Sequence, residues 1–199
     1  MNARAPQKRR LETRQRLIDA ASAIVSDGGF AALRVEDVVA RAEVAKGTFF
    51  SHFEDKDRLM ALLIGEEMTR ILSQVAAGPA PSSIPAFADT LAPLFDYMAQ
   101  DRVVFDLVVR FSGAMAIETT ELISLNFLHQ VEQVAEWIKP LQGKVIRDDV
   151  DALLLAEGVQ AFAIQSMAFN FCALHNTGTM RERLTCYLQA WMAPVRSAQ

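Results

Sequence analysis

Apolar residues recur at the spacing of an α-helix in every periodic segment of this chain, and no run alternates in the manner of a β-strand. In the first segment, one apolar stripe precedes Gly28-Gly29, a pair typical of a helix end; the stripe holds Leu17, Ala20, Ala21, Ile24 and Val25. Further helices are expected over residues 35–42, 45–53, 55–76, 87–98, 102–115, 118–139, 148–175 and 179–193. The pattern therefore predicts an all-α protein of about nine helices.

A break in the helical pattern and an uneven distribution of charge suggest that this chain has two domains. Residues 78–85 are rich in Pro, Gly and Ser and cannot continue a helix. Residues 1–60 hold eleven Lys and Arg against nine Asp and Glu, whereas the remainder holds nine against fifteen. A basic first part on an acidic body suits local contact with phosphates. We expect an N-terminal domain over residues 1–54, with a basic arm and three helices, and a helical C-terminal domain over residues 55–199.

Composition narrows the class of protein. Hydrophobic residues make up 51% and charged residues 22%, enough for a packed core. The net charge of −4 argues against a protein that coats nucleic acid without regard to sequence. Cys172 and Cys186 form no ligand-spaced cluster, so we expect a reducing compartment and no metal or cofactor. The N-terminus lacks a secretory signal and the apolar stretch 158–174 contains several amides, so we expect a cytoplasmic protein outside the membrane.

Residues 35–53 have the pattern of a helix-turn-helix. The first helix, 35–42, would bury Val38, Val39 and Ala42, and the turn would be Glu43-Val44. The second helix would bury Phe49 and Phe53 and expose a small polar face that can enter the major groove of DNA; this face holds Lys46, Gly47, Thr48, Ser51 and His52. A corner built for stability alone would rarely hold Gly47, which costs about 1 kcal/mol relative to Ala inside a helix.

Each polar side chain of this face suits a particular contact with DNA. Lys46 can reach a guanine edge or a phosphate, and Thr48 and His52 can bond phosphate oxygens. Lys56, at the start of the next helix, would clamp the DNA backbone. These contacts predict a sequence-specific DNA-binding protein.

Residues 29–59 resemble the N-terminal domain of the TetR family of bacterial transcriptional regulators. The resemblance is carried by Gly29-Phe30, Lys46-Gly47-Thr48, Phe50, His52-Phe53, Lys56 and Leu59. With the first helix it covers roughly a quarter to a third of the chain. The resemblance implies a repressor that a small molecule releases from a DNA operator.

The chain departs from the family pattern at four positions. Arg34 and Ala45 stand where the family has hydroxyl residues that cap the two helices, so both helices are expected to be less firmly capped. Glu43 replaces the usual Gly of the turn, and Phe50 replaces the common Tyr. We expect Arg34 to offer a charged phosphate contact, and the Phe50 ring to pack against a sugar or a thymine methyl group.

The last two helices look like the dimer interface of TetR-like proteins. Residues 158–180 contain no charged residue, so a helix there must be covered on nearly every side. The interface residues expected on these helices are Gly158, Ala161, Ala168, Leu184, Leu188 and Trp191. One recognition helix covers few base pairs, so a homodimer on a palindromic operator is expected. A core helix packed only within its own chain is the alternative.

By the same resemblance, an apolar or aromatic effector would bind among the helices after residue 85. Its expected contacts are Phe95, Met98, Phe105, Phe111, Asn126, His129, Gln133, Gln165 and Phe169. In the alternative function, the C-terminal domain only dimerises or binds a protein partner. An enzyme finds little support, because no grouping of nucleophile, base and orienting residue is visible.

Overall fold

The computed structural model describes all residues except 1–3, 113–121, 173–177 and 195–199, and contains nine α-helices and no strand within the described residues. The all-α class expected from the sequence is therefore confirmed. The α-helices are α1 (Arg4–Gly28), α2 (Val35–Arg41), α3 (Lys46–Phe50), α4 (Lys56–Ala76), α5 (Ile84–Met98), α6 (Arg102–Arg110), α7 (Leu122–Ile138), α8 (Ala152–Asn170) and α9 (Met180–Met192). Two short 3₁₀ turns, η1 (Phe30–Ala32) and η2 (Lys139–Leu141), complete the described elements.

The chain divides into two compact units, Met1–Ile64 and Gly65–Gln199. The division falls inside α4, about ten residues beyond the boundary expected at residue 54. Leu59, Met60 and Ile64 in the first turns of α4 are buried, and they belong to the first unit by this division.

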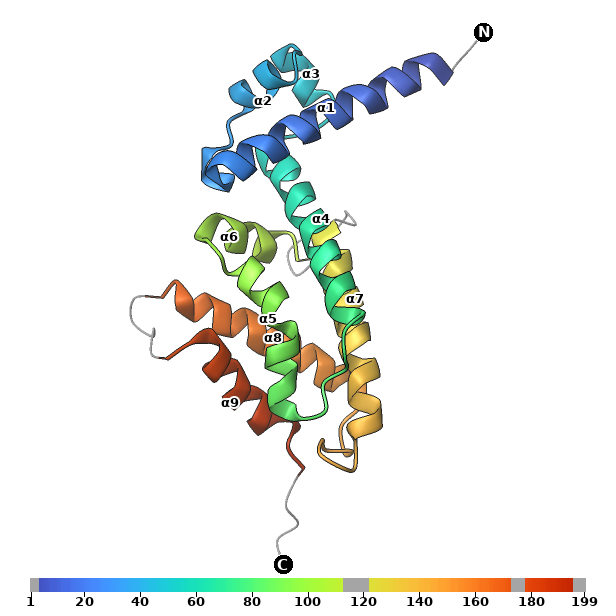
Figure 1. Cartoon of the computed structure of the whole chain (residues 1–199), viewed down its shortest axis with the longest axis vertical. Helices are drawn as coiled ribbons and strands as arrows, with labels where there is room; N and C mark the ends of the chain where they lie inside the picture. Colours follow the sequence, from blue (N-terminus) through green and yellow to red (C-terminus); the bar gives the residue numbers. More distant parts are fainter. Residues whose placement is uncertain (1–3, 113–121, 173–177, 195–199) are drawn as a thin grey trace, which may run out of the picture. The chain divides into compact units, whose positions relative to one another are not determined.

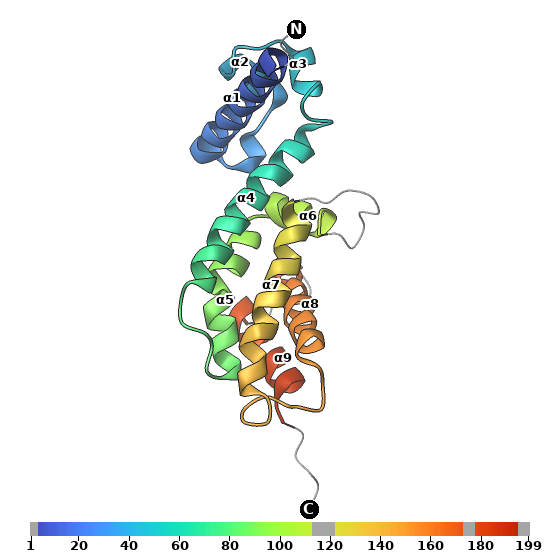
Figure 2. The same ribbon diagram turned by 90° about the vertical axis from the view of Figure 1, so that its right-hand side faces the viewer.

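Local chemistry fixes the helix ends of the first unit. Gly29 has φ of 73°, a left-handed conformation that suits glycine, and its N–H donates to the carbonyl oxygen of Val25 at the end of α1. Asp55 accepts a hydrogen bond from the backbone N–H of Arg58 and so caps α4. Within this unit, α2 packs against α1, and α3 packs against α2 (Figures 1 and 2).

The second unit is a bundle in which α8 packs against α7 and α9, and α5 packs against α9 (Figure 2). Three of its helices have side-chain caps: Asp101 caps α6, Asp151 caps α8, and Thr179 forms a reciprocal capping box with Glu182 on α9. One expectation about this unit is wrong. Residues 78–85 were expected to be non-helical throughout, yet α5 begins at Ile84, because Pro85 fits the first turn of a helix, where its missing N–H is not needed.

Two close approaches hold the bundle together. A Cβ atom added to Gly158 would lie 2.2 Å from Nε1 of Trp191, so only glycine allows α9 to come this near to α8. The same Trp191 nitrogen donates to the carbonyl oxygen of Leu155. On α4, a Cβ at Gly65 would lie 2.8 Å from Cβ of Leu122 on α7. These glycines are needed for helix packing.

By length and composition α8 is the one described helix that could cross a membrane, although a core helix of a soluble protein passes the same test. Only 39% of its apolar window is buried within the chain. Leu153 and Leu154 are about half exposed, at 46% and 50%. An apolar helix that is this exposed leaves a surface available to a partner.

Candidate functional site

The turn between α2 and α3 forms where the sequence predicted it. Val38 and Ala42 are buried, and the N–H of Val44 donates to the carbonyl oxygen of Val39 at 3.0 Å. Glu43 has φ of 54° and is the one non-glycine residue with positive φ among the described residues. A side chain is disfavoured in this left-handed conformation, which explains why glycine suits this turn better.

Both helices of the motif lack a side-chain cap. Arg34 and Ala45 occupy the N-cap positions of α2 and α3 in extended conformations, and neither side chain makes a capping hydrogen bond. The expectation of weak capping is confirmed. Because Ala45 is the cap itself, α3 begins at Lys46 rather than at Ala45 and ends at Phe50 rather than at Phe53.

The faces of α3 separate apolar from polar residues. Phe49 and Phe53 are buried and their rings lie 5.6 Å apart, as expected for core residues. Lys46, Gly47 and Ser51 are exposed, and Thr48 and His52 are half-buried. Phe50 is 51% exposed, an unusual position for a large apolar ring.

Gly47 is not required by the packing of its own unit. A Cβ atom added to Gly47 would meet nothing within 4 Å, unlike one added to Gly65 or Gly158. Its cost to the helix is therefore not repaid by a close approach within the chain. Among the described residues, no close approach accounts for glycine at this position.

Charged side chains from three helices surround the outer face of α3. The ammonium of Lys46 donates to the Glu36 carboxylate of α2 at 2.6 Å, and this hydrogen bond lowers the pKa of Glu36. Partial burial, with Arg10 and Arg14 of α1 nearby, lowers the pKa of His52. The guanidinium of Arg14 also lies 4.8 Å from the centre of the Phe53 ring. Sequence reasoning missed Glu36, because α2 was considered only for its buried face.

Two further expected contacts, Arg34 and Lys56, lie just outside α3. Arg34 is exposed before α2, and Lys56 is half-buried at the first position of α4. Each of the eight expected DNA contacts therefore keeps some accessible surface.

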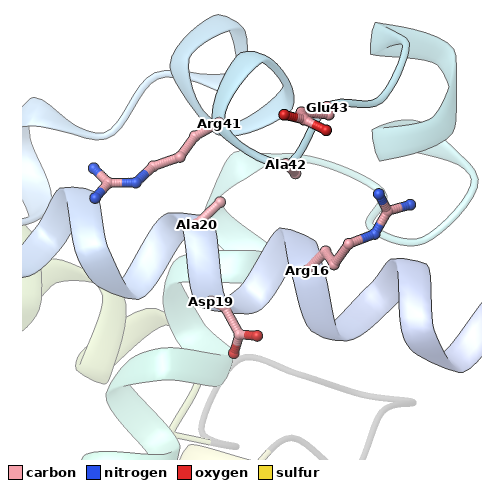
Figure 3. Close-up of a pocket in the computed structure, with 6 residues that line it drawn as sticks. All are labelled: Arg16, Asp19, Ala20, Arg41, Ala42 and Glu43. Atoms are coloured by element: carbon pink, nitrogen blue, oxygen red, sulfur yellow. The ribbon is translucent and has the colours of Figure 1, made fainter.

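A surface pocket of about 310 Å³ lies between α1 and the turn after α2 (Figure 3). Ala20 on α1 faces the turn that carries Ala42, and these small side chains let the two elements approach closely. Two cationic and two anionic side chains complete the lining: Arg16, Arg41, Asp19 and Glu43. Balanced charges of this kind favour neither an anion nor a cation.

In the second unit the expected effector contacts separate into three groups. Phe95, Met98, Phe105 and Phe111 are buried in the core, while Gln133 and Phe169 are half-buried. His129 and Gln165 are exposed on α7 and α8, because they fall on the outer faces of their helices. These two side chains therefore do not face the interior of the unit, where the buried aromatic contacts lie.

Asn126 is buried, but its side chain is fully occupied. Its amide donates to the carbonyl oxygens of Gly65 and Leu122 at 2.9 and 2.8 Å, and its oxygen accepts from the Thr69 hydroxyl at 3.1 Å. Asn126 therefore joins α7 to α4, and its polar atoms are already used within the chain.

Two other buried polar side chains have no hydrogen-bond partner. Gln130, one turn after Asn126 on α7, is 1% exposed, and neither its Oε1 nor its Nε2 is bonded. Ser166 on α8 is fully buried and its hydroxyl is also unbonded. Sequence reasoning missed both residues; the available signal was an amide and a hydroxyl on apolar helical faces.

The surface of α7 and α8 has a groove of about 390 Å³. Apolar side chains form most of its lining, and the Oε1 atom of Gln160 within it is buried and unbonded. The full lining is Ser112, Ser124, Phe127, Leu128, Val131, Glu157, Gln160, Ala161 and Ile164.

The residues expected at a dimer interface do not share one exposed surface. Leu184 and Leu188 are buried within the chain, so their placement at an interface is wrong. Gly158 and Trp191 are half-buried and pack against each other in the same chain. The reason is that the apolar stripe of α9 faces its own α5 and α8. Ala161 is exposed and Ala168 half-buried, so they remain candidates for an interface.

The N-terminal unit matches a family model. Residues 17–63 match the model described as "Bacterial regulatory proteins, tetR family". The chain is 24% identical over 137 residues to the HTH-type transcriptional repressor DhaR of Mycobacterium sp. (strain GP1), covering 69% of this chain and 67% of DhaR. It is 42% identical over 60 residues to the HTH-type transcriptional repressor KstR of Mycobacterium tuberculosis (strain ATCC 25618 / H37Rv), covering 30% of this chain and 27% of KstR.

Solved structures share the fold over nearly the whole chain. A TetR-family transcriptional regulator from Pectobacterium atrosepticum matches with a TM-score of 0.60 at 20% identity, covering 95% of this chain and 93% of the other. SmeT, the repressor of the Stenotrophomonas maltophilia multidrug efflux pump SmeDEF, matches with a TM-score of 0.57 at 15% identity, covering 90% of each chain. These structures extend the likeness from the N-terminal unit to the helical body.

Proposed function

Since this chain belongs to the tetR family of bacterial regulatory proteins, we propose that it is a transcriptional repressor that binds a DNA operator as a homodimer and is released by a small molecule. The outer face of α3 carries the DNA-binding part of this proposal. It combines exposed polar side chains with Gly47, a glycine that the packing of the chain does not require. A helix with such a face can enter the major groove without steric obstruction.

We assign the contacts by side-chain chemistry. Lys46 reads a guanine edge or binds a phosphate, and Thr48, Ser51 and His52 bond phosphate oxygens. Arg34 and Lys56 hold the DNA backbone on either side of α3, and the exposed Phe50 ring packs against a sugar or a thymine methyl group.

Selection of binding sites from a random DNA pool tests the DNA-binding role. The full-length chain should enrich one sequence, and Lys46→Ala and His52→Ala should weaken binding to it while leaving the oligomeric state unchanged. Fluorescence anisotropy at several salt concentrations measures the affinity, and light scattering measures the mass. Failure of the wild-type chain to enrich any sequence would overturn the proposal.

The homodimer is proposed on the exposed face of α8. This face carries Leu153, Leu154 and Ala161, three apolar residues that the chain itself leaves accessible. A two-fold dimer has two copies of α3, one for each half of a palindromic operator. Ala161→Glu places a charge on this face and should produce monomers. Gln189→Glu places the same charge on the exposed face of α9 and is the control, which should leave the dimer intact if the interface is confined to α8.

The effector site is proposed in the interior of the second unit. Buried polar groups are normally hydrogen-bonded, so the unbonded polar atoms of Gln130 and Ser166 are available to a bound molecule in this interior. The buried aromatic side chains of α5 and α6 suit an apolar or aromatic body on that molecule.

Release from DNA tests the effector role. A panel of neutral aromatic compounds is added to the complex with the selected DNA, and a releasing compound should raise the melting temperature of the wild-type chain but not of Gln130→Leu. If compounds never release the DNA while a protein partner does, the second unit only dimerises or binds that partner.

A further inference from the structure

Glu36 and Lys46 form an ion pair across the helix-turn-helix. Glu36 lies in the first turn of α2 and Lys46 at the start of α3, and their side chains meet at 2.6 Å. Both side chains are well exposed, at 66% and 58%. The hydrogen bond from Lys46 lowers the pKa of Glu36, so the carboxylate stays charged at neutral pH.

The pair is not needed to hold the two helices together. Exposed ion pairs contribute little to stability, because water and salt screen them. The packing of α2 on α3 instead rests on buried apolar side chains such as Val38 and Phe49. A carboxylate beside the recognition helix therefore needs another explanation, particularly since it would face a negatively charged ligand.

We propose that Glu36 determines the specificity of DNA recognition by aiming Lys46 and by reducing its attraction to phosphate. The inference rests on the DNA-binding role proposed for α3. One of the three donors of the ammonium is held by Glu36, which restricts where the other two can point. A lysine aimed in this way bonds a guanine edge at one position of the site, while an unrestrained lysine binds any nearby phosphate.

The carboxylate also repels the DNA backbone. This repulsion acts on every DNA sequence, whereas the aimed contact forms only on the correct one. Glu36 thus weakens binding to non-operator DNA more than binding to the operator. The ratio of the two affinities increases as a result, which is the quantity that matters among many competing sites.

Glu36→Gln tests this role, with Glu54→Gln as the matched control. Glu54 is another exposed carboxylate of the same unit, paired with Arg58 at 3.5 Å. Affinities are measured by fluorescence anisotropy for a scrambled duplex and for a duplex selected by the wild-type chain. For the scrambled duplex, Glu36→Gln should bind about 3–10-fold more tightly at low salt, and the slope of log K against log salt should steepen by about 0.9.

Affinity for the selected duplex should change less, so the specificity ratio should fall in Glu36→Gln and stay within about twofold of wild type in Glu54→Gln. Equal changes on both duplexes, or the same change in Glu54→Gln, would overturn the inference. In a Lys46→Met background the effect of Glu36→Gln on the salt slope should shrink; an undiminished effect would show that Glu36 does not act through Lys46.

If the wild-type chain selects no sequence at all, the proposed DNA-binding function fails instead.

Discussion

The two units use polar residues in opposite ways. In the first unit the polar side chains that we assign to function point outward from α3, and the apolar ones hold the helix in place. In the second unit the informative polar side chains are inside: Asn126 is bonded on every side, and Gln130, one turn away, has no partner. Outward residues can be recognised from a motif, whereas the role of a buried amide depends on neighbours that come from distant parts of the chain.

The largest expected effect is a loss of stability when the hydrogen bonds of Asn126 are removed. Asn126→Leu removes the bond to Gly65, leaves the Thr69 hydroxyl without its amide partner, and should lower the free energy of unfolding by about 2–3 kcal/mol. Urea unfolding followed by circular dichroism measures the change. An effect below about 0.5 kcal/mol would mean that the contact between α4 and α7 is not important for stability.

The next effect is on DNA and not on folding. Lys46→Ala should weaken binding to the selected site by about 10–100-fold, the value of one base-specific contact. The melting temperature should stay almost unchanged, because the Lys46 side chain is exposed. Arg110→Ala, an exposed basic residue of the second unit, is the control and should leave the affinity unaffected. A loss of stability as large as the loss of affinity would contradict the outward assignment of α3.

Gln130→Leu sharpens the comparison within α7. Because neither polar atom of the Gln130 amide is bonded, replacing it with an apolar side chain of similar size should raise the free energy of unfolding by about 1 kcal/mol. Asn126→Leu on the same helix should have the opposite sign. A destabilisation of similar size in both variants would show that Gln130 is also a structural residue.

Glu43→Gly tests the strain in the turn. Glycine removes the steric cost of the left-handed conformation but adds freedom to the unfolded chain, so a net stabilisation of about 0.5–1 kcal/mol is expected. Glu43→Ala keeps a Cβ atom and should not give this gain. If both variants behave alike in thermal unfolding, the backbone of residue 43 is not strained.

The smallest effect is a pH dependence from His52. Its pKa is lowered in the folded protein, so the unfolded chain binds the proton more readily below the ordinary value of 6.5. The stabilising contribution is complete above pH 6.5 and is lost as the pH falls through the lowered pKa. Comparison of wild type and His52→Gln by urea unfolding between pH 5 and pH 8 isolates this contribution; an identical slope in both would contradict it.

The sequence predicted the helices and the exposed polar face over residues 46–52, because both depend on local patterns. The 3.6-residue period placed most helix ends within a few residues, and the spacing from Lys46 to His52 identified the outer face of α3. Contacts between distant segments could not be predicted in this way. The apolar stripe of α9, with Leu184 and Leu188, was assigned to a partner chain, although it packs inside its own chain. Periodicity shows that a face is buried, but it does not show what covers it.

The tryptophan that packs against Gly158 gives the protein a fluorescence signal. Both tryptophans of the sequence, Trp137 and Trp191, belong to the second unit. Trp137 is buried on α7, whereas Trp191 is half-buried, lies on the backbone of Gly158 and donates to Leu155. Intrinsic tryptophan fluorescence therefore monitors the second unit without a contribution from α3, and Trp137→Phe leaves a single tryptophan at the contact between α8 and α9.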